Sequence, residues 1–279
     1  MEITLTKPIA EGRTAEIYAW QDGTVLKLYH PWFPSNLVEY ESIVAHAVVA
    51  AGIPTPAAGE IIEVNGRRGT IFERVSGISM LQDMNNHPWR IITHARTLAE
   101  LQFRVNQLSF PGLNSYKDGL AYAIQQAPPL DDSLRKKALN LLFSLPDGEK
   151  VCHGDFHPGN IMLTGRGAVV IDWLTVSTGS PIADFARTSI LLTIGPKGAA
   201  NQISPVVALF IRLFYQIYAR HYLQLMPDTH HERHKWLTVI AAARLAEQIE
   251  PERLDLIGIV KKGVSRWDET TSIPIQPDD

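Results

Sequence analysis

The pattern of the sequence changes near residue 75, from segments typical of strands to segments typical of helices. Runs rich in β-branched and aromatic residues predict strands at 2–8, 14–20, 24–30, 60–64 and 69–75, with one helix at 36–52 among them. Beyond them, helical patterns predict helices at 88–108, 115–127, 131–144, 181–194, 201–225, 232–249 and 251–264. This order predicts an α+β protein with a strand-rich N-terminal lobe, residues 1–75, and a mostly helical C-terminal lobe, residues 76–279.

Two short turns refine this prediction. Asn65-Gly66 separates two strand-like runs, which is a strong signal for a β-hairpin. The run "NIML" is followed by the turn "TGRG" and by "AVVIDW", so a second, small hairpin is expected near residues 160–173. This hairpin interrupts the otherwise helical C-terminal part.

Composition excludes several classes of protein. The net charge of −3 provides no overall positive field for nucleic acid or an anionic membrane. The single cysteine, Cys152, cannot form an intramolecular disulfide or a thiolate cluster. The longest apolar stretch is interrupted by Arg212 and Arg220, and the N-terminus has no apolar signal segment. We therefore expect a cytoplasmic protein that binds neither nucleic acid nor membrane.

The stretch "HGDFHPGNIML", residues 153–163, gathers polar and turn-forming residues between apolar runs. Its glycines and proline disfavour a helix, so Asp155 is expected on a loop from which it can reach a cleft. Asn160 follows closely, and Asp172 ends the apolar run "AVVID". Two carboxylates and an amide oxygen are hard oxygen groups of the kind that Mg²⁺ and phosphate chemistry use.

The spacing H-x-D-x-x-x-x-N followed by a strand ending in Asp resembles the catalytic and metal-binding motifs of the protein-kinase-like superfamily. The segments "HGDFHPGNIML", "VVIDW" and "SPIADFAR" together resemble the aminoglycoside phosphotransferase and choline kinase family. His157 stands where protein kinases typically carry Lys, and no Ala-Pro-Glu motif follows Asp172. The resemblance implies a bilobal protein-kinase-like fold with a small antiparallel sheet in the N-terminal lobe.

The resemblance also implies roles for the residues of this stretch. Asp155 would position the acceptor hydroxyl and take its proton, while Asn160 and Asp172 would hold Mg²⁺ on the phosphates of ATP. His157 would either orient substrate or serve the structure of the loop. Asp184, in "SPIADFAR", is expected to support the catalytic loop through hydrogen bonds.

Lys27 lies among apolar residues in the strand-like run "TVLKLYH". In the kinase pattern a lysine at this place reaches the phosphates and pairs with a glutamate of the next helix. Glu41 falls within the apolar stripe of helix 36–52, whereas Glu39 does not. Because a carboxylate on a buried face needs a cationic partner, we expect Glu41 rather than Glu39 to pair with Lys27.

The remaining nucleotide-binding positions come from the family pattern. Gly12, Arg13 and Thr14 would form the loop over the phosphates, although this loop has fewer glycines than that of protein kinases. Val25 would cover the adenine. Backbone groups near Glu73 and Val75, in "FERVSG", would hydrogen-bond to it.

The function expected from the sequence is the transfer of the ATP γ-phosphate to a hydroxyl of a small molecule, with GTP as an alternative donor. An aminoglycoside or another amine-bearing acceptor is expected, and Glu247 and Glu250 are either amine-binding groups or part of a solvated face. A nucleotide-binding pseudokinase and a protein kinase of the same fold are the alternatives. The sequence does not predict the oligomeric state.

Overall fold

The computed structural model describes the whole chain except residues 1–4, 6, 22, 200–202, 228–231 and 272–279. The chain forms two compact units. The first comprises residues 1–88 and 158–176, and the second comprises residues 89–157 and 177–279. The chain therefore leaves the first unit after residue 88 and returns to it for one short segment. The lobe boundary expected at residue 75 remains a prediction.

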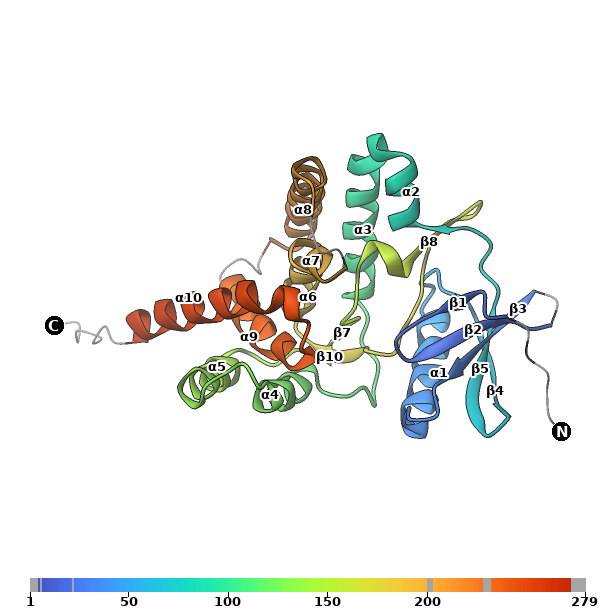
Figure 1. Cartoon of the computed structure of the whole chain (residues 1–279), viewed down its shortest axis with the longest axis horizontal. Helices are drawn as coiled ribbons and strands as arrows, with labels where there is room; N and C mark the ends of the chain where they lie inside the picture. The colour runs from blue at the N-terminus through green and yellow to red at the C-terminus, as the bar shows by residue number, and fades with distance from the viewer. Residues whose placement is uncertain (1–4, 6, 22, 200–202, 228–231, 272–279) are drawn as a thin grey trace. The chain divides into compact units, whose positions relative to one another are not determined.

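A five-stranded antiparallel sheet forms the basis of the first unit, with the strand order β1-β2-β3-β5-β4 (Figure 1). Its strands are β1 (Ala10–Glu11), β2 (Ala15–Ala19), β3 (Thr24–Tyr29), β4 (Ala58–Val64) and β5 (Arg67–Glu73). Leu26 and Leu28 of the central strand β3 are fully buried in one hydrophobic cluster. Because successive side chains of a strand point to opposite faces, Lys27 and Tyr29 lie on the other face of β3.

Helix α1 (Ser35–Ala50) packs against β4 and β5 (Figure 1). Its buried residues recur every three or four positions, which places them on one side of the helix. They include the apolar Val38, Val44 and Val48 and, between them, the carboxylate of Glu41. The helical spacing thus carries one charged group onto the buried side of α1.

The hairpin turn expected at Asn65-Gly66 is confirmed, because it joins β4 to β5. Asn65 and Gly66 have φ angles of 52° and 76°. Positive φ at both central residues is the requirement of the tight hairpin turn that Asn-Gly favours. This turn brings β4 back along β5 and so closes one edge of the sheet.

The same unit contains a three-stranded sheet with the order β6-β8-β9. Its elements and their neighbours are β6 (Ile78–Ser79), α2 (Met80–Asn86), the 3₁₀ helix η2 (Pro158–Asn160), β8 (Ile161–Thr164) and β9 (Gly167–Val170). A Cβ added at Gly77 would lie 2.1 Å from the carbonyl oxygen of Leu163, so only glycine fits at this approach. The small hairpin predicted near residues 160–173 is confirmed as β8 and β9.

The second unit is mostly helical. Its helices are α3 (Ile91–Val105), α4 (Tyr116–Gln126), α5 (Asp132–Ser144), α6 (Pro181–Thr193), α7 (Gly195–Ala199), α8 (Pro205–Leu225), α9 (Arg233–Arg244) and α10 (Arg253–Thr271). Short 3₁₀ helices are η1 (Pro88–Arg90), η4 (Leu245–Glu247) and η5 (Glu250–Glu252). The strands β7 (Lys150–Cys152) and β10 (Ser177–Gly179) pair antiparallel. Helix α3 lies beside α8, and α9 lies beside α10 (Figure 1).

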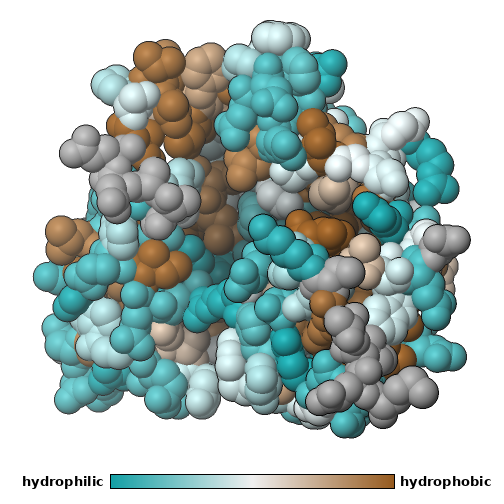
Figure 2. All heavy atoms as spheres, turned by 45° about the vertical axis from the view of Figure 1, so that its right-hand side comes forward, coloured by the Kyte–Doolittle hydropathy of each residue, from teal (hydrophilic) through white to brown (hydrophobic). Residues whose placement is uncertain are grey.

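The N-terminal half of α8 exposes apolar side chains to solvent. Figure 2 shows hydrophobic residues gathered where α8 lies in Figure 1. The exposed apolar residues of this helix are Val206, Val207, Leu209, Phe210 and Leu213. None of the helices in the described part of the chain is long and apolar enough to cross a membrane.

The secondary structure predicted from the sequence differs from the structure in a few places. The strand expected at 2–8 falls partly outside the described residues, and those of its residues that are described are not in a strand. The short helices α2 and α7 were not predicted, because five to seven residues are too few for a helical period to be recognised. The short strands β1, β6, β7 and β10, of two or three residues each, were not predicted either. The longer helices and strands occur close to their predicted positions.

Candidate active site

The loop that carries Asp155 follows β7 in the second unit and is anchored to α6. The backbone N–H of Gly154 donates to Asp184 Oδ1 at 2.9 Å, and the carbonyl oxygen of Gly154 accepts from Arg187 Nε at 3.1 Å. Gly154 has a φ of 78°, a conformation that favours glycine. Two side chains one helical turn apart on α6 thus fix both backbone groups of the residue before Asp155.

Asp184 is held by further hydrogen bonds within the second unit. It is fully buried, and its Oδ2 accepts from the side-chain amides of Gln102 at 2.9 Å and Asn106 at 3.0 Å. A buried carboxylate is stable only where hydrogen bonds replace its hydration. Asn106 also donates to the carbonyl oxygen of Val151 at 2.8 Å. The hydrogen bond expected between Asp184 and the loop that carries Asp155 is confirmed, and this support extends to α3.

Asp155 itself is half-buried, and its surroundings favour the ionised form. Burial opposes the charge, but a hydrogen bond and positive charge from His157 and the charge of Arg187 together lower the pKa of Asp155 well below its ordinary value. His157 Nε2 lies 3.5 Å from Asp155 Oδ2. The carboxylate is therefore ionised at neutral pH and can accept a hydrogen bond from a hydroxyl group.

The first unit contains a compact ionic cluster around Lys27. Lys27 Nζ donates to Glu41 Oε1 at 2.7 Å and to Asp172 Oδ1 at 2.9 Å. Burial lowers the pKa of the Lys27 ammonium, but the two carboxylates outweigh burial and raise that pKa above its ordinary value. The ion pair predicted between Lys27 and Glu41 is present, whereas the exposed Glu39 pairs with Arg68 at 2.8 Å.

Asn160 and Asp172 lie near each other at one end of the β8–β9 hairpin. The N–H of Ile171 donates to the carbonyl oxygen of Asn160 at 3.0 Å, which joins the two segments next to these side chains. Asp172 has a φ of 66°, an uncommon conformation for a residue other than glycine. Such backbone conformations occur often where a side chain has a functional orientation.

The donor set of this hairpin fits a magnesium ion. The side chain of Asp172 is 40% exposed, so a cation in solvent can reach it. Among the described residues no three His, Cys, Asp or Glu side chains cluster as a complete metal site. Mg²⁺ commonly binds through one or two protein oxygens, with phosphate and water filling its other positions. Asn160 and Asp172 are suitable for this mode of binding.

The other predicted nucleotide-binding residues lie along the five-stranded sheet. Gly12, Arg13 and Thr14 connect β1 to β2, and Gly12 N–H donates to Ala15 O at 2.9 Å. Val25 is half-buried on β3, directly opposite Phe72 of β5.

Glu73 ends β5, and its carboxylate pairs with Arg166 at 3.2 Å. Val75 follows two residues later and is half-buried. All these positions belong to the first unit, and their part in binding nucleotide remains a prediction.

Arg187 was not predicted from the sequence, although it contacts the loop that carries Asp155. Its NH2 group also pairs with Glu247 Oε1 at 2.7 Å, while Glu247 Oε2 pairs with Arg244 at 2.9 Å. Arg244 makes two further bonds to Glu252, at 2.6 and 2.8 Å. No local pattern predicts these contacts, because Arg187 lies 60 residues from Glu247. Glu250, in contrast, is exposed and lies 3.4 Å from Arg253.

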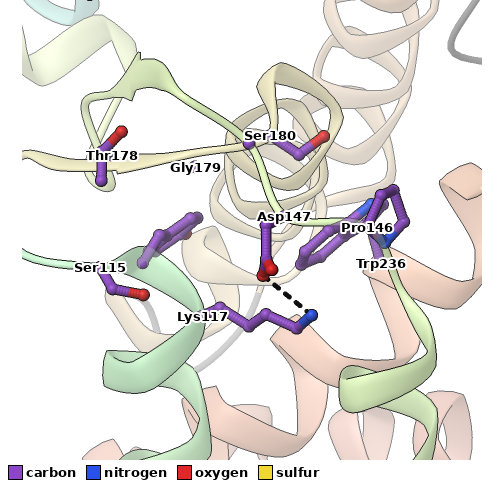
Figure 3. A pocket seen from close by; sticks show the side chains of 10 residues that line it. Ser115, Lys117, Pro146, Asp147, Thr178, Gly179, Ser180 and Trp236 are labelled. Atoms are coloured by element: carbon purple, nitrogen blue, oxygen red, sulfur yellow. Dashed lines mark ion pairs between the residues drawn. The ribbon is translucent and has the colours of Figure 1, made fainter.

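A small hollow of about 80 Å³ lies elsewhere in the second unit (Figure 3). The ion pair between Lys117 and Asp147, 3.0 Å long, lies beside it, and the buried indole of Trp236 forms part of its wall. Neither Asp155 nor Arg187 lines this hollow. It is too small for a sugar or an antibiotic, so it is not a candidate for the acceptor site.

Comparisons with known proteins identify the family of the chain. Residues 6–237 match the model of the phosphotransferase enzyme family, APH. No curated protein matched the sequence.

Solved structures resemble the chain over most of its length. One of them is a thermostable mutant of the aminoglycoside phosphotransferase APH(4)-Ia, in a ternary complex with AMP-PNP and hygromycin B. It superposes with a TM-score of 0.64 at 14% sequence identity, and the alignment covers 96% of this chain and 94% of that chain. A choline/ethanolamine kinase family protein from Mesorhizobium loti has a TM-score of 0.56 at 15% identity, with coverages of 95% and 87%. The amicoumacin kinase hAmiN, in complex with AMP-PNP, Ca²⁺ and Ami, has a TM-score of 0.61 at 14% identity, with coverages of 98% and 90%. This likeness shows an α+β fold of the protein-kinase-like type.

Proposed function

The chain belongs to the phosphotransferase enzyme family, and from this premise we propose that it transfers the γ-phosphate of ATP to a hydroxyl group of a small molecule. The observation that carries the proposal is the ionic cluster in which Lys27 joins Glu41 to Asp172. A lysine held by a buried glutamate and lying next to a metal-binding aspartate is the arrangement that kinases use to bind nucleotide phosphates. The likeness to complexes with AMP-PNP supports ATP as the donor.

Each group of the site has a task in this reaction. Lys27 binds the phosphates, and Glu41 fixes the direction of its ammonium group. Asn160 and Asp172 hold Mg²⁺, which neutralises charge on the phosphate oxygens when it is bound. Asp155 orients the acceptor hydroxyl and accepts its proton. Catalysis of phosphoryl transfer by these residues is mainly positioning and charge neutralisation.

The acceptor is proposed to be a small alcohol, because the similar structures include complexes with hygromycin B and streptomycin and a choline/ethanolamine kinase family protein. The structure weakens one argument for an amine-bearing acceptor, the proposed binding of an amine by Glu247. Glu247, one of the carboxylates considered for amine binding, uses both oxygens on Arg187 and Arg244. Glu247 is therefore better explained as a structural partner of these arginines, whereas the exposed Glu250 lies 3.4 Å from Arg253.

Release of ADP from MgATP tests the proposal. The purified chain is assayed with a panel of aminoglycosides, macrolides, choline, amino alcohols and sugars, and the phosphorylated product is identified by mass spectrometry. We expect Asp155→Asn to lower kcat by about 10²- to 10⁴-fold, the usual contribution of a general base. Asp147→Asn is the matched control, because Asp147 is a highly exposed carboxylate in the same unit that pairs with Lys117 and lines the small hollow, which Asp155 does not line.

The outcomes separate the candidate functions. Stimulation of ADP release by a compound in the wild type and in Asp147→Asn, but not in Asp155→Asn, supports the phosphotransferase. Binding of MgATP without turnover on any acceptor or on protein mixtures favours a nucleotide-binding pseudokinase. Phosphate incorporated into proteins of such a mixture identifies a protein kinase instead.

A further inference from the structure

Tyr29 contacts the ionic cluster of the first unit from within the sheet. It follows Lys27 by two residues on β3, so both side chains lie on the face of the sheet that contacts α1. Its hydroxyl donates a hydrogen bond to Glu41 Oε2, while the ammonium of Lys27 donates to Glu41 Oε1. The two oxygens of one buried carboxylate are thus bound by two neighbouring residues of one strand.

The ring of Tyr29 is fixed by its surroundings. The side chain is 1% exposed and stacks on Phe33, with ring centroids 5.0 Å apart. The Lys27 ammonium lies 5.6 Å from the centroid of the tyrosine ring. The backbone carbonyl of Tyr29 accepts from Arg67 Nε at 2.9 Å. Because ring and backbone are both held, the hydroxyl has little freedom to leave Glu41.

The second hydrogen bond has a consequence for Lys27. A carboxylate bound through one oxygen can rotate and swing about that contact, whereas a carboxylate bound through both oxygens has a fixed plane. Burial and the nearby Glu41 carboxylate raise the pKa of the Tyr29 hydroxyl, so this group remains a proton donor at all physiological pH values. The direction of the Lys27 ammonium therefore depends on the neutral hydroxyl of Tyr29. This hydroxyl acts through the Glu41 carboxylate, to which both groups are bound.

We propose that Tyr29 is a positioning residue of the nucleotide site, which acts through Glu41 to aim Lys27 at the phosphates. This inference rests on the proposed function, since it assigns Tyr29 to the site that binds ATP. Tyr29 makes no contact with the reacting atoms in this role. Its effect is on the affinity for the nucleotide and not on the affinity for the acceptor.

The substitution Tyr29→Phe removes the hydroxyl and keeps the ring. We expect the dissociation constant for MgAMP-PNP, measured by calorimetry, to rise about three- to tenfold, which corresponds to the net contribution of one ordinary hydrogen bond, because the lost bond acts on the nucleotide only through Glu41. Tyr18→Phe is the matched control, because Tyr18 is also buried in this sheet, and its hydroxyl donates to Glu16 at 3.1 Å, outside the ionic cluster. Nucleotide affinity should be unchanged in this control.

A double-mutant cycle with Glu41→Gln distinguishes positioning from general destabilisation. If Tyr29 acts through Glu41, Tyr29→Phe should weaken binding of MgAMP-PNP much less in the Glu41→Gln background than in the wild type. All titrations are made at a temperature at which circular dichroism shows every variant folded. A substitution that merely destabilises the sheet lowers the melting temperature of the folded protein and leaves nucleotide affinity at that temperature unchanged.

Two results would overturn the inference. One is equal affinity of wild type and Tyr29→Phe for MgAMP-PNP, which leaves the proposed function intact. The other is an effect of Tyr29→Phe that is the same with and without Glu41. If the wild type itself binds neither MgAMP-PNP nor MgATP, the proposed function fails, and the role of Tyr29 in nucleotide binding fails with it.

Discussion

The two units each contain a cluster of charged side chains, and the clusters differ in their charge balance. In the first unit, the single ammonium of Lys27 lies between two carboxylates, Glu41 and Asp172. In the second unit, two guanidinium groups, Arg187 and Arg244, alternate with two carboxylates, Glu247 and Glu252. The first cluster has one carboxylate in excess, and the second is balanced.

This difference indicates what each cluster does. An excess carboxylate that is 40% exposed, as Asp172 is, leaves the first cluster ready to accept a cation. The balanced cluster is more deeply buried at Arg244 and Glu252, with side chains 6% and 1% exposed. We infer that the first cluster is a binding site. The second cluster holds η4 and η5 against α9 and connects them, through Arg187, to the loop that carries Asp155.

Removing the excess carboxylate should affect activity most strongly. We expect Asp172→Asn to lower kcat by about a hundredfold or more, because it removes the charged group that we propose to hold Mg²⁺. The unfolding midpoint in denaturant should change little, since Lys27 keeps Glu41 as its partner. A large loss of stability together with full activity would show that the first cluster is structural and not a binding site.

Breaking the balanced cluster should instead affect stability. Arg244→Met removes the partner of the buried Glu252 and is expected to lower the free energy of unfolding by about 3–5 kcal/mol, the usual cost of stranding a buried charge. The double variant Arg244→Met/Glu252→Leu should recover much of this loss. Urea denaturation followed by circular dichroism measures both effects. Wild-type stability in Arg244→Met would show that this cluster is not structural.

The pH dependence of stability offers a third test, at Asp155. The pKa of this carboxyl is lower in the folded than in the unfolded chain, so its ionised form stabilises the fold above the unfolded value, near pH 4. That contribution is lost as the pH falls below this value toward the folded pKa. The difference in unfolding free energy between wild type and Asp155→Asn should therefore shrink as the pH falls from about 4 toward the folded pKa. A difference that grows as the pH falls below about 4 would contradict the ionised state assigned to Asp155.

The smallest effect on stability and nucleotide affinity is expected from substitution of Glu39. This residue lies on the same helix as Glu41, and its exposed carboxylate pairs with Arg68 of β5. Glu39→Gln should change the free energy of unfolding by about 0–1 kcal/mol, because solvent and salt screen exposed ion pairs. Nucleotide affinity should not change. Glu41→Gln is compared in the same calorimetric titration with MgAMP-PNP, where we expect it to weaken nucleotide binding. Equal effects of the two substitutions on nucleotide affinity would contradict the assignment of Glu41 as the partner of Lys27.

Several parts of the fold and site were predictable because their signals are local. Asn65-Gly66 specifies its hairpin turn through the backbone freedom of two adjacent residues. Glu41 was preferred to Glu39 because the helical period alone decides which of them is buried. The motif spacing marked Asp155, Asn160 and Asp172 as candidates, and the last two prove to share one hairpin end.

The tertiary structure alone decided how these candidates are held. Arg187 reaches the carbonyl of Gly154 across 33 residues, and Gln102 reaches Asp184 across 82. Helical and strand periods determine the face on which a residue lies, but not which residue of another element it meets. The sequence therefore determined the longer helices and strands and marked the candidate residues of the site, whereas packing between distant segments determined the partners that orient their charged groups.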